Sequence, residues 1–595
     1  MEEFDLLIKN ATIVDGSDKP AYKGSIAVKG DKVVAVGPIT GDAKEVIDAS
    51  GLTAVPGFID SHSHADTNIL FYPKCENYVL QGVTTFIGGQ CGISPAPIGD
   101  MIPLPGEARE YIDKLVGPYK YSPAKSLFPR EQVNGIMKEH FGWTVDWETM
   151  GDFFKVVEKK GISANYVPLL GHGAVRSLVM GEDHKRQATK VEIAQMVGLI
   201  RQGMEDGCIG MSVGLDYDPD VFADRKELVE CMSVLKEYDG IFVPHSRRTG
   251  RRVNVAMGHR MPDPIDAIYE VLDLCRATGV RMNIAHLFTG WYITPRGGPS
   301  ILEEANRKAT LMVIDEALKE SLNISFDAIP SVLFTRFAGS SYLCAAFEPW
   351  LREYESREKF AEWLKAKDIR EEVKDAIYRG KLYMRNNPNT DPRWAENIVV
   401  LKHKSSACEN KSLAKIAMER GRDPFETWFD LIVEDPDSMV GGGAIGGGAD
   451  PEAPYHALFY QHPVGTVGLD TGVVDYKYQP KIPPLDAPVI SQYSAYVGFF
   501  DKFVNRMRSL TLEQAVQKTS TLVAKHHKIK GRGVIKEGCY ADIILMNLPN
   551  LKVTGTPLEP RQQPKGIEYV FVNGVAVVKN AKHTEATPGR VLRRE

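Results

Sequence analysis

The sequence lacks three features, each of which would indicate a particular class of protein. No apolar run approaches the roughly 18 residues of a membrane-spanning helix. A formal net charge of −5 and a pI near 6.3 lack the basic surplus typical of nucleic-acid binding. The opening residues, MEEFDLLIKN, carry neither the basic nor the apolar region of a signal peptide. We therefore expect a cytoplasmic protein with no nucleic-acid or membrane partner.

A disulfide framework is also excluded, because the 8 cysteines are scattered along 595 residues without a CxxC pair. We expect most of these thiols to be small, buried side chains in a reducing compartment. Cys91 is the exception, because it lies in the glycine-rich segment GGQCGIS. The flanking glycines let the backbone turn tightly there and present the sulfur.

The chain is longer than one hydrophobic core usually supports, so we expect one large domain and a smaller one. Alternating apolar residues at both ends predict a small β-sandwich built from 1–56 and 535–595. Between them, 57–534 alternates short apolar runs with segments of helical periodicity, which predicts an α/β fold, a (β/α)8 TIM barrel. The predicted barrel strands are 57–62, 83–91, 164–171, 208–213, 240–245, 281–286, 323–327 and 463–470.

Two long insertions interrupt this alternation. Residues 92–163 link the second and third predicted strands, and 328–462 link the seventh and eighth. The second insertion contains a charged helical stretch, 348–378, and the glycine-rich tract GGGAIGGGAD. Barrel insertions of this length often cover the active site, so we predict that 328–462 is a cap or lid. A surface decoration or a dimer arm is the alternative.

Residues that bind metals or move protons follow almost every predicted strand. The chain has only 14 histidines, and any one of them alone is more often structural than catalytic. Together, at the strand ends that form the catalytic face of a barrel, they indicate one centre. They are His62 and His64 (strand one), Cys91 (two), His172 (three), His245 (five), His286 (six), Asp327 (seven) and Asp470 (eight).

The residue types suit zinc-dependent hydrolysis. Imidazole nitrogens and a thiolate are good zinc ligands, and a catalytic zinc keeps a position open for water. Asp470, after the last strand, is placed to take a proton from that water and pass it to a leaving group. A salt bridge at the rim of the barrel is the alternative role for this carboxylate.

These segments resemble the amidohydrolase superfamily and, more closely, the N-acyl-D-amino-acid deacylase (D-aminoacylase) family. Dihydroorotase- and hydantoinase-like relatives use a carboxylated lysine on strand four, which CIGMSVG lacks, so the strand-two cysteine is the most specific element. The resemblance runs almost end to end and is carried by PGFIDSHSHAD (56–66), GVTTFIGGQCGISPAP (82–97), NYVPLLGHGAVR (165–176), GCIGMSVGLDYDP (207–219) and the segment 509–547.

The resemblance implies a tightly held zinc on Cys91, His245 and His286. It implies a second, weaker metal position on His62 and His64 that shares Cys91.

The resemblance also implies roles for the remaining polar residues. Asp470 is the general acid/base, and Asp66 and Asp327 orient the ligand histidines. His172 either donates a hydrogen bond to the substrate or packs behind the metal ligands.

The sequence departs from the family where the substrate's carboxylate is held. Phe288 replaces a lysine after strand six, and Ile329 replaces a tyrosine after strand seven. An aromatic and an aliphatic side chain do not form the charge-assisted hydrogen bonds that a carboxylate needs. Either another cation has taken over, with Arg176, Arg247, Arg248 and Arg296 as candidates, or the substrate lacks that carboxylate. The paired change to apolar residues favours a more apolar substrate.

Three hypotheses about function follow. The leading one is a zinc-dependent amidohydrolase that hydrolyses the C–N bond of a small N-acyl compound. The second is a metal hydrolase with the same centre that acts on an aromatic or cyclic amide, an ester or a carbon–carbon bond. The third is a metal-free scaffold, which retention of all the predicted ligands disfavours. Self-association into a homo-oligomer is left open.

Overall fold

The computed structural model describes residues 4–116, 127–216, 218–247, 264–287, 300–330, 339–354, 356–379, 388–389, 394–442, 453–479 and 486–594. In this part of the chain, the helices are too short or too polar to cross a membrane. Elements that belong neither to the sheets and helices described below nor to the insertion 328–462 are α1 (Glu76–Val79), α2 (Asp113–Val116), α3 (Arg130–Phe141), α15 (Leu458–Gln461), β8 (Met101–Ile102) and β9 (Phe128–Pro129).

The two ends of the chain share one 9-stranded sheet. The sheet has the order β24-β23-β22-β21-β5-β1-β2-β3, with β4 also paired to β1. The ends meet where β5 pairs antiparallel with β21, with Ile543 opposite Pro56. The strands are β1 (Phe4–Ile13), β2 (Tyr22–Lys29), β3 (Lys32–Gly37), β4 (Ala43–Asp48), β5 (Thr53–Pro56), β21 (Ile543–Met546), β22 (Ile567–Val572), β23 (Val575–Lys579) and β24 (Lys582–His583).

Every one of the eight apolar runs in the middle of the chain contains a strand, and all pairings among these strands are parallel. They form two sheets, β6-β7-β10 and β11-β12-β13-β14-β15-β19. The strands are β6 (Phe58–Asp60), β7 (Val83–Gly88), β10 (Asn165–Pro168), β11 (Leu170–Gly171), β12 (Gly210–Gly214), β13 (Ile241–His245), β14 (Arg281–Ile284), β15 (Ile324–Ala328) and β19 (Gly465–Val467).

Backbone hydrogen bonds connect the first and last of these parallel strands. The Ser61 amide donates to the Val467 carbonyl at 3.4 Å, and the Asp470 amide donates to the His62 carbonyl at 2.8 Å. The carboxylate of Asp60 strengthens this connection, because it accepts hydrogen bonds from the amides of His62 and Leu469. The segments that carry the first and last predicted ligands are therefore adjacent.

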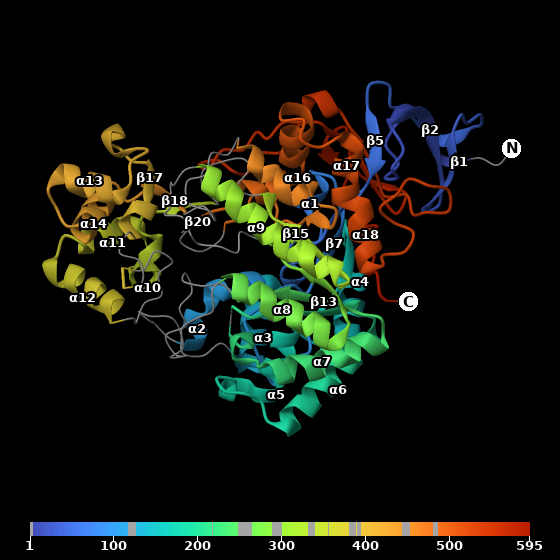
Figure 1. Ribbon diagram of the computed structural model, residues 1–595. Helices are drawn as coiled ribbons and strands as arrows, with labels where there is room; N and C mark the ends of the chain where they lie inside the picture. Colours follow the sequence, from blue (N-terminus) through green and yellow to red (C-terminus); the bar gives the residue numbers. More distant parts are fainter. Residues whose placement is uncertain are drawn as a thin grey trace.

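Helices alternate with the parallel strands and lie outside them (Figure 1). Helix α6 shows why they begin and end where they do, because Thr189 and Glu192 form a capping box and Gly207 ends the helix at φ 114°. The helices are α4 (Met150–Lys160), α5 (His172–Met180), α6 (Lys190–Asp206), α7 (Arg225–Glu237), α8 (Pro264–Thr278), α9 (Ser300–Lys319), α16 (Ile490–Phe500), α17 (Leu512–Val516) and α18 (Leu522–His527).

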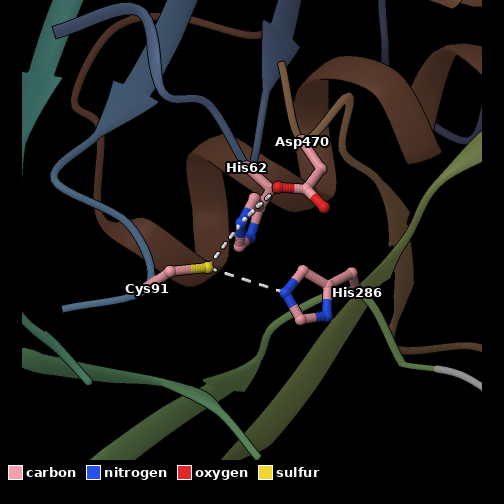
Figure 2. A group of neighbouring side chains, drawn as sticks. All are labelled: His62, Cys91, His286 and Asp470. Atoms are coloured by element: carbon pink, nitrogen blue, oxygen red, sulfur yellow. Dashed lines mark hydrogen bonds and ion pairs between the residues drawn. The ribbon is translucent and has the colours of Figure 1, made fainter. Parts of the chain in front are cut away.

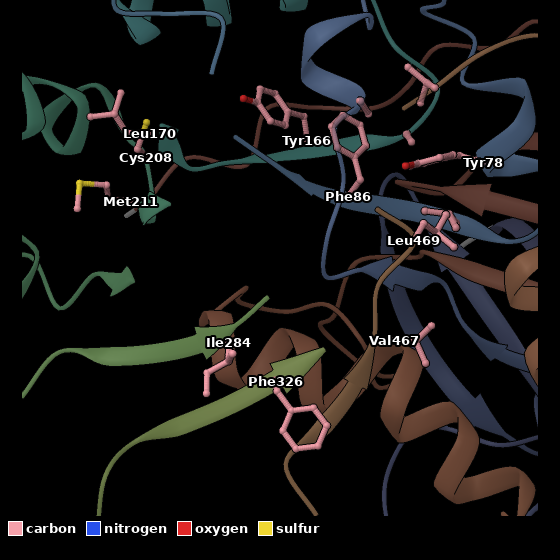
Figure 3. Close-up of a cluster of buried hydrophobic side chains, with 14 of the residues drawn as sticks. Tyr78, Phe86, Tyr166, Leu170, Cys208, Met211, Ile284, Phe326, Val467 and Leu469 are labelled. Carbon is pink, nitrogen blue, oxygen red and sulfur yellow. The ribbon is translucent and has the colours of Figure 1, made fainter. Parts of the chain in front are cut away.

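The parallel strands are buried on both faces, as continuous apolar runs predict. Phe86 and Tyr166 belong to the larger core cluster, which includes residues of the helices (Figure 3). Their neighbours in sequence, Ile87 and Val167, belong to a separate cluster, which Val523 of α18 completes. Successive residues of a strand thus pack into different clusters, as the period of two in a strand requires.

The insertion 328–462 has a hydrophobic core of its own around Trp350, Trp428 and Phe429. The charged stretch 348–378 forms three helices, with Ser356 as the N-cap of the second. Figure 1 shows this part at the left, away from β7 and β13. Its elements are α10 (Glu348–Glu353), α11 (Arg357–Trp363), α12 (Lys367–Tyr378), α13 (Leu413–Arg420), α14 (Pro424–Glu434), β16 (Gly339–Tyr342), β17 (Val399–Lys402) and β18 (Met439–Gly442), and β18 and β16 continue to β20 (Asp486–Ala487) in a 4-stranded sheet.

Candidate metal centre

Three of the predicted site residues leave the β conformation just after their strands end. Cys91, His286 and Asp470 have φ values of 53°, 34° and 55°, in the left-handed region that non-glycine residues seldom adopt. They follow β7, β14 and β19 by two or three residues. In each case the positive φ ends the extended backbone, and the side chain lies at the carboxyl end of the sheet. Strained backbone of this kind is common at functional sites.

The sulfur of Cys91 is surrounded by imidazole nitrogens. Its Sγ lies 3.4 Å from His62 Nε2, 3.4 Å from His245 Nδ1 and 3.6 Å from His286 Nε2. Ligands about 2.3 Å (S) and 2.0 Å (N) from a zinc ion, at a tetrahedral angle, lie about 3.5 Å apart. The measured separations therefore fit donors around a single ion.

Four segments contribute to the tightest group of donors in the described part of the chain. One donor atom from each of His62, Cys91, His286 and Asp470 lies within 4.8 Å of all the others (Figure 2). His62 is fully buried, whereas the side chain of Asp470 is 30% exposed. Asp470 therefore lies on the accessible side of the group, and the other donors lie beneath it.

The carboxylate of Asp470 links the two histidines of the His-x-His pair. Its Oδ1 lies 3.5 Å from His62 Nε2 and 3.2 Å from His64 Nε2. Burial disfavours its charged form, but the two imidazoles hold the pKa of Asp470 well below its usual value. Asp470 is consequently ionised.

The charges of the centre favour a cation. Burial disfavours a thiolate, but the imidazoles of His62 and His245 hold the pKa of Cys91 well below its usual value. Burial likewise opposes a charge on His62, but Cys91 and Asp327 raise the pKa of that imidazole well above its usual value. A thiolate and the carboxylate of Asp470 among imidazoles form a donor set that suits a divalent metal of the zinc type.

Asp327 connects His286 with His62. It accepts hydrogen bonds from the His286 amide at 2.8 Å and from Asn283 Nδ2 at 2.7 Å, and it lies 3.7 Å from His62 Nδ1. A similar carboxylate, Asp216, lies 3.6 Å from His245 Nε2. Such outer carboxylates fix the orientation of ligand imidazoles. Sequence reasoning missed Asp216, although its position just after the fourth strand, in GLDYDP, was a usable signal.

Asp60 is the last residue of β6, and Asp66 follows β6 by six residues; both are buried. Burial raises the pKa of Asp66 to about 6, against the effect of the nearby His64. Burial raises the pKa of Asp60 to about 7, although backbone amides lower it. The prediction that Asp66 orients a ligand histidine stays a prediction.

His172 lies in a buried ion network next to the turn that follows Cys91. Its Nδ1 lies 2.8 Å from Asp220 Oδ1, and its Nε2 lies 3.3 Å from Glu227 Oε1. A Cβ added at Gly92 would meet Asp220 Oδ2 at 2.1 Å, so this network packs directly against the turn. These contacts favour positioning of the Cys91 loop, and the predicted hydrogen bond from His172 to a substrate stays a prediction.

Two of the arginines considered as carboxylate binders donate to groups of the protein. Arg176 is fully buried and donates to Glu227 at 2.9 Å and to the His184 carbonyl at 2.6 Å. Arg247 donates to Glu270 at 3.0 Å and to the Val221 carbonyl at 2.7 Å. Both guanidinium groups therefore hold neighbouring segments together.

Of the other residues considered for substrate binding, the structure describes Ile329. Ile329 follows β15 directly and is half-buried. Phe288, Arg248 and Arg296 lie outside the described residues.

A cavity of about 340 Å³ extends from Cys91 along the first insertion. Charged groups of both signs, Arg109, Lys185 and Glu182, also border it. Asp218, Asp220 and His184 line it as well. The large apolar side chains of its wall are Ile93, Pro97, Ile98, Met101, Pro103, Leu127 and Leu178.

The sequence and the fold are similar to those of known proteins. A model of the amidohydrolase family matches residues 45–233. D-aminoacylase from Alcaligenes xylosoxydans xylosoxydans is 26% identical over 594 residues, which cover 100% of this chain and 98% of the relative.

Among solved structures, a crystal structure of D-aminoacylase matches with a TM-score of 0.66 at 23% identity, covering 99% of this chain and 100% of that one. N-acyl-D-glutamate deacylase from Bordetella bronchiseptica, complexed with zinc and a phosphonate inhibitor, matches with a TM-score of 0.65 at 22% identity and covers 100% of both chains. The chain thus has the fold of these proteins along its whole length.

Proposed function

We propose that this chain is a zinc-dependent hydrolase that cleaves the amide C–N bond of an N-acyl compound, like the D-aminoacylases it resembles. One observation carries this proposal. A thiolate surrounded by three imidazoles lies beneath a partly exposed carboxylate, at the carboxyl ends of parallel strands. This is where enzymes of parallel α/β folds place their catalytic groups.

In this proposal Cys91, His245 and His286 hold the tightly bound zinc. His62 and His64 hold a second, weaker metal position that shares Cys91. Zinc in such a site supplies an activated water at neutral pH and polarises the substrate carbonyl. Asp327 orients the imidazole of His62, and Asp216 orients that of His245.

Asp470 is the general acid/base of the proposed reaction. As an ionised carboxylate on the accessible side, it takes the proton from the attacking water. It then delivers that proton to the departing amine nitrogen. His64, 3.2 Å from its Oδ1, holds the carboxylate in position for both transfers.

The same proposal includes the finer architecture. The two parallel sheets form one closed (β/α)8 barrel over 57–534, and the segments 1–56 and 535–595 form a separate β-sandwich domain. The insertion 328–462 acts as a cap, and its independent hydrophobic core supports this role.

A second candidate function keeps the metal centre but changes the substrate and the bond that is cleaved. The same centre would act on an aromatic or cyclic amide, an ester or a carbon–carbon bond in a molecule without a carboxylate. The protein contacts of Arg176 and Arg247, and the apolar wall of the cavity beside Cys91, favour such a substrate.

Metal analysis and a substrate panel test both candidates. We expect protein purified without chelator to contain zinc and to hydrolyse members of a panel of N-acyl-D-amino acids. Activity confined to uncharged amides would favour the second candidate. Metal-free protein without hydrolase activity would overturn the proposal and favour a scaffold.

The cavity wall predicts a selective effect of Ile93→Glu. Ile93 is 43% exposed and borders the cavity beside Cys91, so a glutamate there places a charge where we expect the acyl group. Losing the burial of an apolar group of this size costs about 1.5–3 kcal/mol of binding free energy, which lowers kcat/KM by roughly 10- to 100-fold. Hydrolysis of long-chain acyl substrates should fall by this factor, and hydrolysis of acetyl substrates should change little.

Val191→Glu is the matched control, because Val191 is 68% exposed on α6 and is not among the residues that line this cavity. It should leave both substrate classes unaffected. An equal loss on acetyl and long-chain substrates in Ile93→Glu, with metal content unchanged, would place the acyl group elsewhere.

A further inference from the structure

The loop that carries Cys91, residues 89–92, has a backbone that must be held in place. Gly89, Cys91 and Gly92 have φ values of 79°, 53° and 74°. A residue with a Cβ seldom adopts such values, so Cys91 keeps this conformation because its neighbours impose it. Figure 2 shows the result, because the Cys91 sulfur is directed from this cysteine loop toward the imidazole of His286.

Strand β12 presents one hydroxyl to the cysteine loop. Met211 and Val213 of this strand pack into the larger core cluster. Side chains alternate along a strand, so Ser212 points to the opposite face, where its neighbours on β12 are the glycines 210 and 214. Ser212 is 0% exposed. A fully buried hydroxyl at this position needs hydrogen-bond partners.

The Ser212 hydroxyl bridges the two ends of the cysteine loop. Its Oγ accepts a hydrogen bond from the Gly92 amide at 2.9 Å and donates one to the Gly89 carbonyl. A hydroxyl is both a donor and an acceptor, so one oxygen serves both groups. The two bonds close a ring around Gln90 and Cys91, and they fix the backbone on each side of the residue that supplies the sulfur.

The bridge also sets where the loop lies relative to the imidazoles. Strand β12 lies next to β13, with Gly214 opposite His245, whose Nδ1 is 3.4 Å from the sulfur. The Ser212 bonds therefore hold the cysteine loop against the neighbour of the strand that carries this histidine. On the other side, Gln90 Nε2 donates to the Ser61 carbonyl at 3.1 Å, one residue before the first histidine of the centre.

The surroundings leave the cysteine loop little room for another arrangement. A Cβ added at Gly89 would meet the Leu169 carbonyl oxygen at 2.0 Å, and one at Gly92 would meet the Gly214 amide nitrogen at 2.9 Å. The Gly92 carbonyl also accepts from the Ala174 amide at 3.1 Å. The backbone of the loop thus packs directly on the elements around it, and Ser212 joins its two ends.

We propose that Ser212 is a positioning residue of the metal centre, whose hydroxyl keeps the thiolate of Cys91 directed at the imidazoles. This role rests on the proposed function, because the metal concerned is the one that the proposed reaction uses. Without the hydroxyl, two buried backbone groups lose a partner. The loop then relaxes toward φ values that a cysteine prefers, and the sulfur leaves its place among the nitrogens. Ser212 acts through Cys91 and does not touch the metal.

Titration of the metal-free protein with Co²⁺ tests the proposal without a substrate. A thiolate bound to Co²⁺ gives an intense sulfur-to-metal absorption band, which imidazole and carboxylate ligands do not give. The unaltered protein should develop this band with saturation. Ser212→Ala should bind Co²⁺ roughly 10- to 100-fold more weakly, as is typical when a partner of a metal ligand is removed, and its band at saturation should be weaker.

Ser520→Ala is the matched control. Ser520 is also 0% exposed, and its Oγ donates to the Gly57 carbonyl at 3.0 Å. Gly57 precedes β6, so this bond lies at the amino end of a parallel strand, whereas the metal ligands follow the carboxyl ends. Both variants lose one buried hydroxyl and should show a similar fall in the Tm of the metal-free protein. Ser520→Ala should bind Co²⁺ like the unaltered protein.

Ser212→Thr separates the hydroxyl from packing, because it restores the donor and acceptor and should recover most of the Co²⁺ affinity. An equal loss in Ser212→Thr and Ser212→Ala would assign the effect to packing and overturn the proposal. Equal affinity and an equal band in Ser212→Ala and the unaltered protein would overturn this role alone. Failure of the unaltered protein to bind Co²⁺ or Zn²⁺ would overturn the proposed function together with it.

Discussion

Cys91→Ala is expected to release the metal and abolish hydrolysis. The thiolate of Cys91 contacts all three of His62, His245 and His286, at 3.4, 3.4 and 3.6 Å. Outer-sphere partners of metal ligands already change metal affinity by about 10- to 100-fold. Removal of a direct, charged ligand should therefore lower zinc affinity by more than about 100-fold. Metal content after dialysis and turnover of a responsive substrate are the measurements.

Two further variants separate ligand loss from a packing defect. Cys91→Ser keeps nearly the same volume but supplies a poor zinc ligand, so it should lose metal as Cys91→Ala does. Cys208→Ala removes another fully buried thiol that belongs to the hydrophobic core, and it should keep its metal. Full zinc content in Cys91→Ala would contradict the ligand assignment.

Metal binding also predicts a difference in stability. The imidazoles and carboxylates around Cys91 are held close together, and a cation stabilises the folded state that brings them there. Chelation should consequently lower the Tm of the unaltered protein. It should leave the Tm of Cys91→Ala nearly unchanged, because that variant has no bound metal to lose.

The sequence was most informative about the strands. Parallel strands buried on both faces are continuous apolar runs, so segments such as GIFVPH and RMNIAH could be located without a structure. The candidate metal ligands could be located from the strands, because the carboxyl ends of parallel strands lie at one edge of the sheet. His245 and His286 could therefore be placed near Cys91 from the order of the strands alone.

The sequence was least informative about contacts between distant segments. Arg176 looked like a free cation near a strand end, but Glu227, 51 residues away, holds its guanidinium. The left-handed conformation of Cys91, His286 and Asp470 was equally hidden, since it is set by the packing of each loop on its neighbours. Propensity carries little information about such positions, because L-residues avoid them unless tertiary contacts impose them.

Asp470→Asn is expected to lower kcat by roughly 10²- to 10⁴-fold while metal and fold are retained. The amide keeps the size of the side chain and its backbone bond to His62, so the loop should stay in place. It no longer takes a proton from water, and it no longer balances the charge that His64 gains at 3.2 Å. The loss should therefore appear in kcat, with KM little changed.

Asp475→Asn is the matched control, because it removes a carboxylate five residues further along the same segment. That carboxylate accepts a hydrogen bond from the amide of Lys477. Its activity should equal that of the unaltered protein. Normal turnover in Asp470→Asn would show that another group moves the proton. A loss of zinc in Asp470→Asn would instead make Asp470 a metal ligand, which its position within 4.8 Å of Cys91, His62 and His286 also allows. Metal analysis alongside kcat therefore decides between a ligand and a proton carrier at this position.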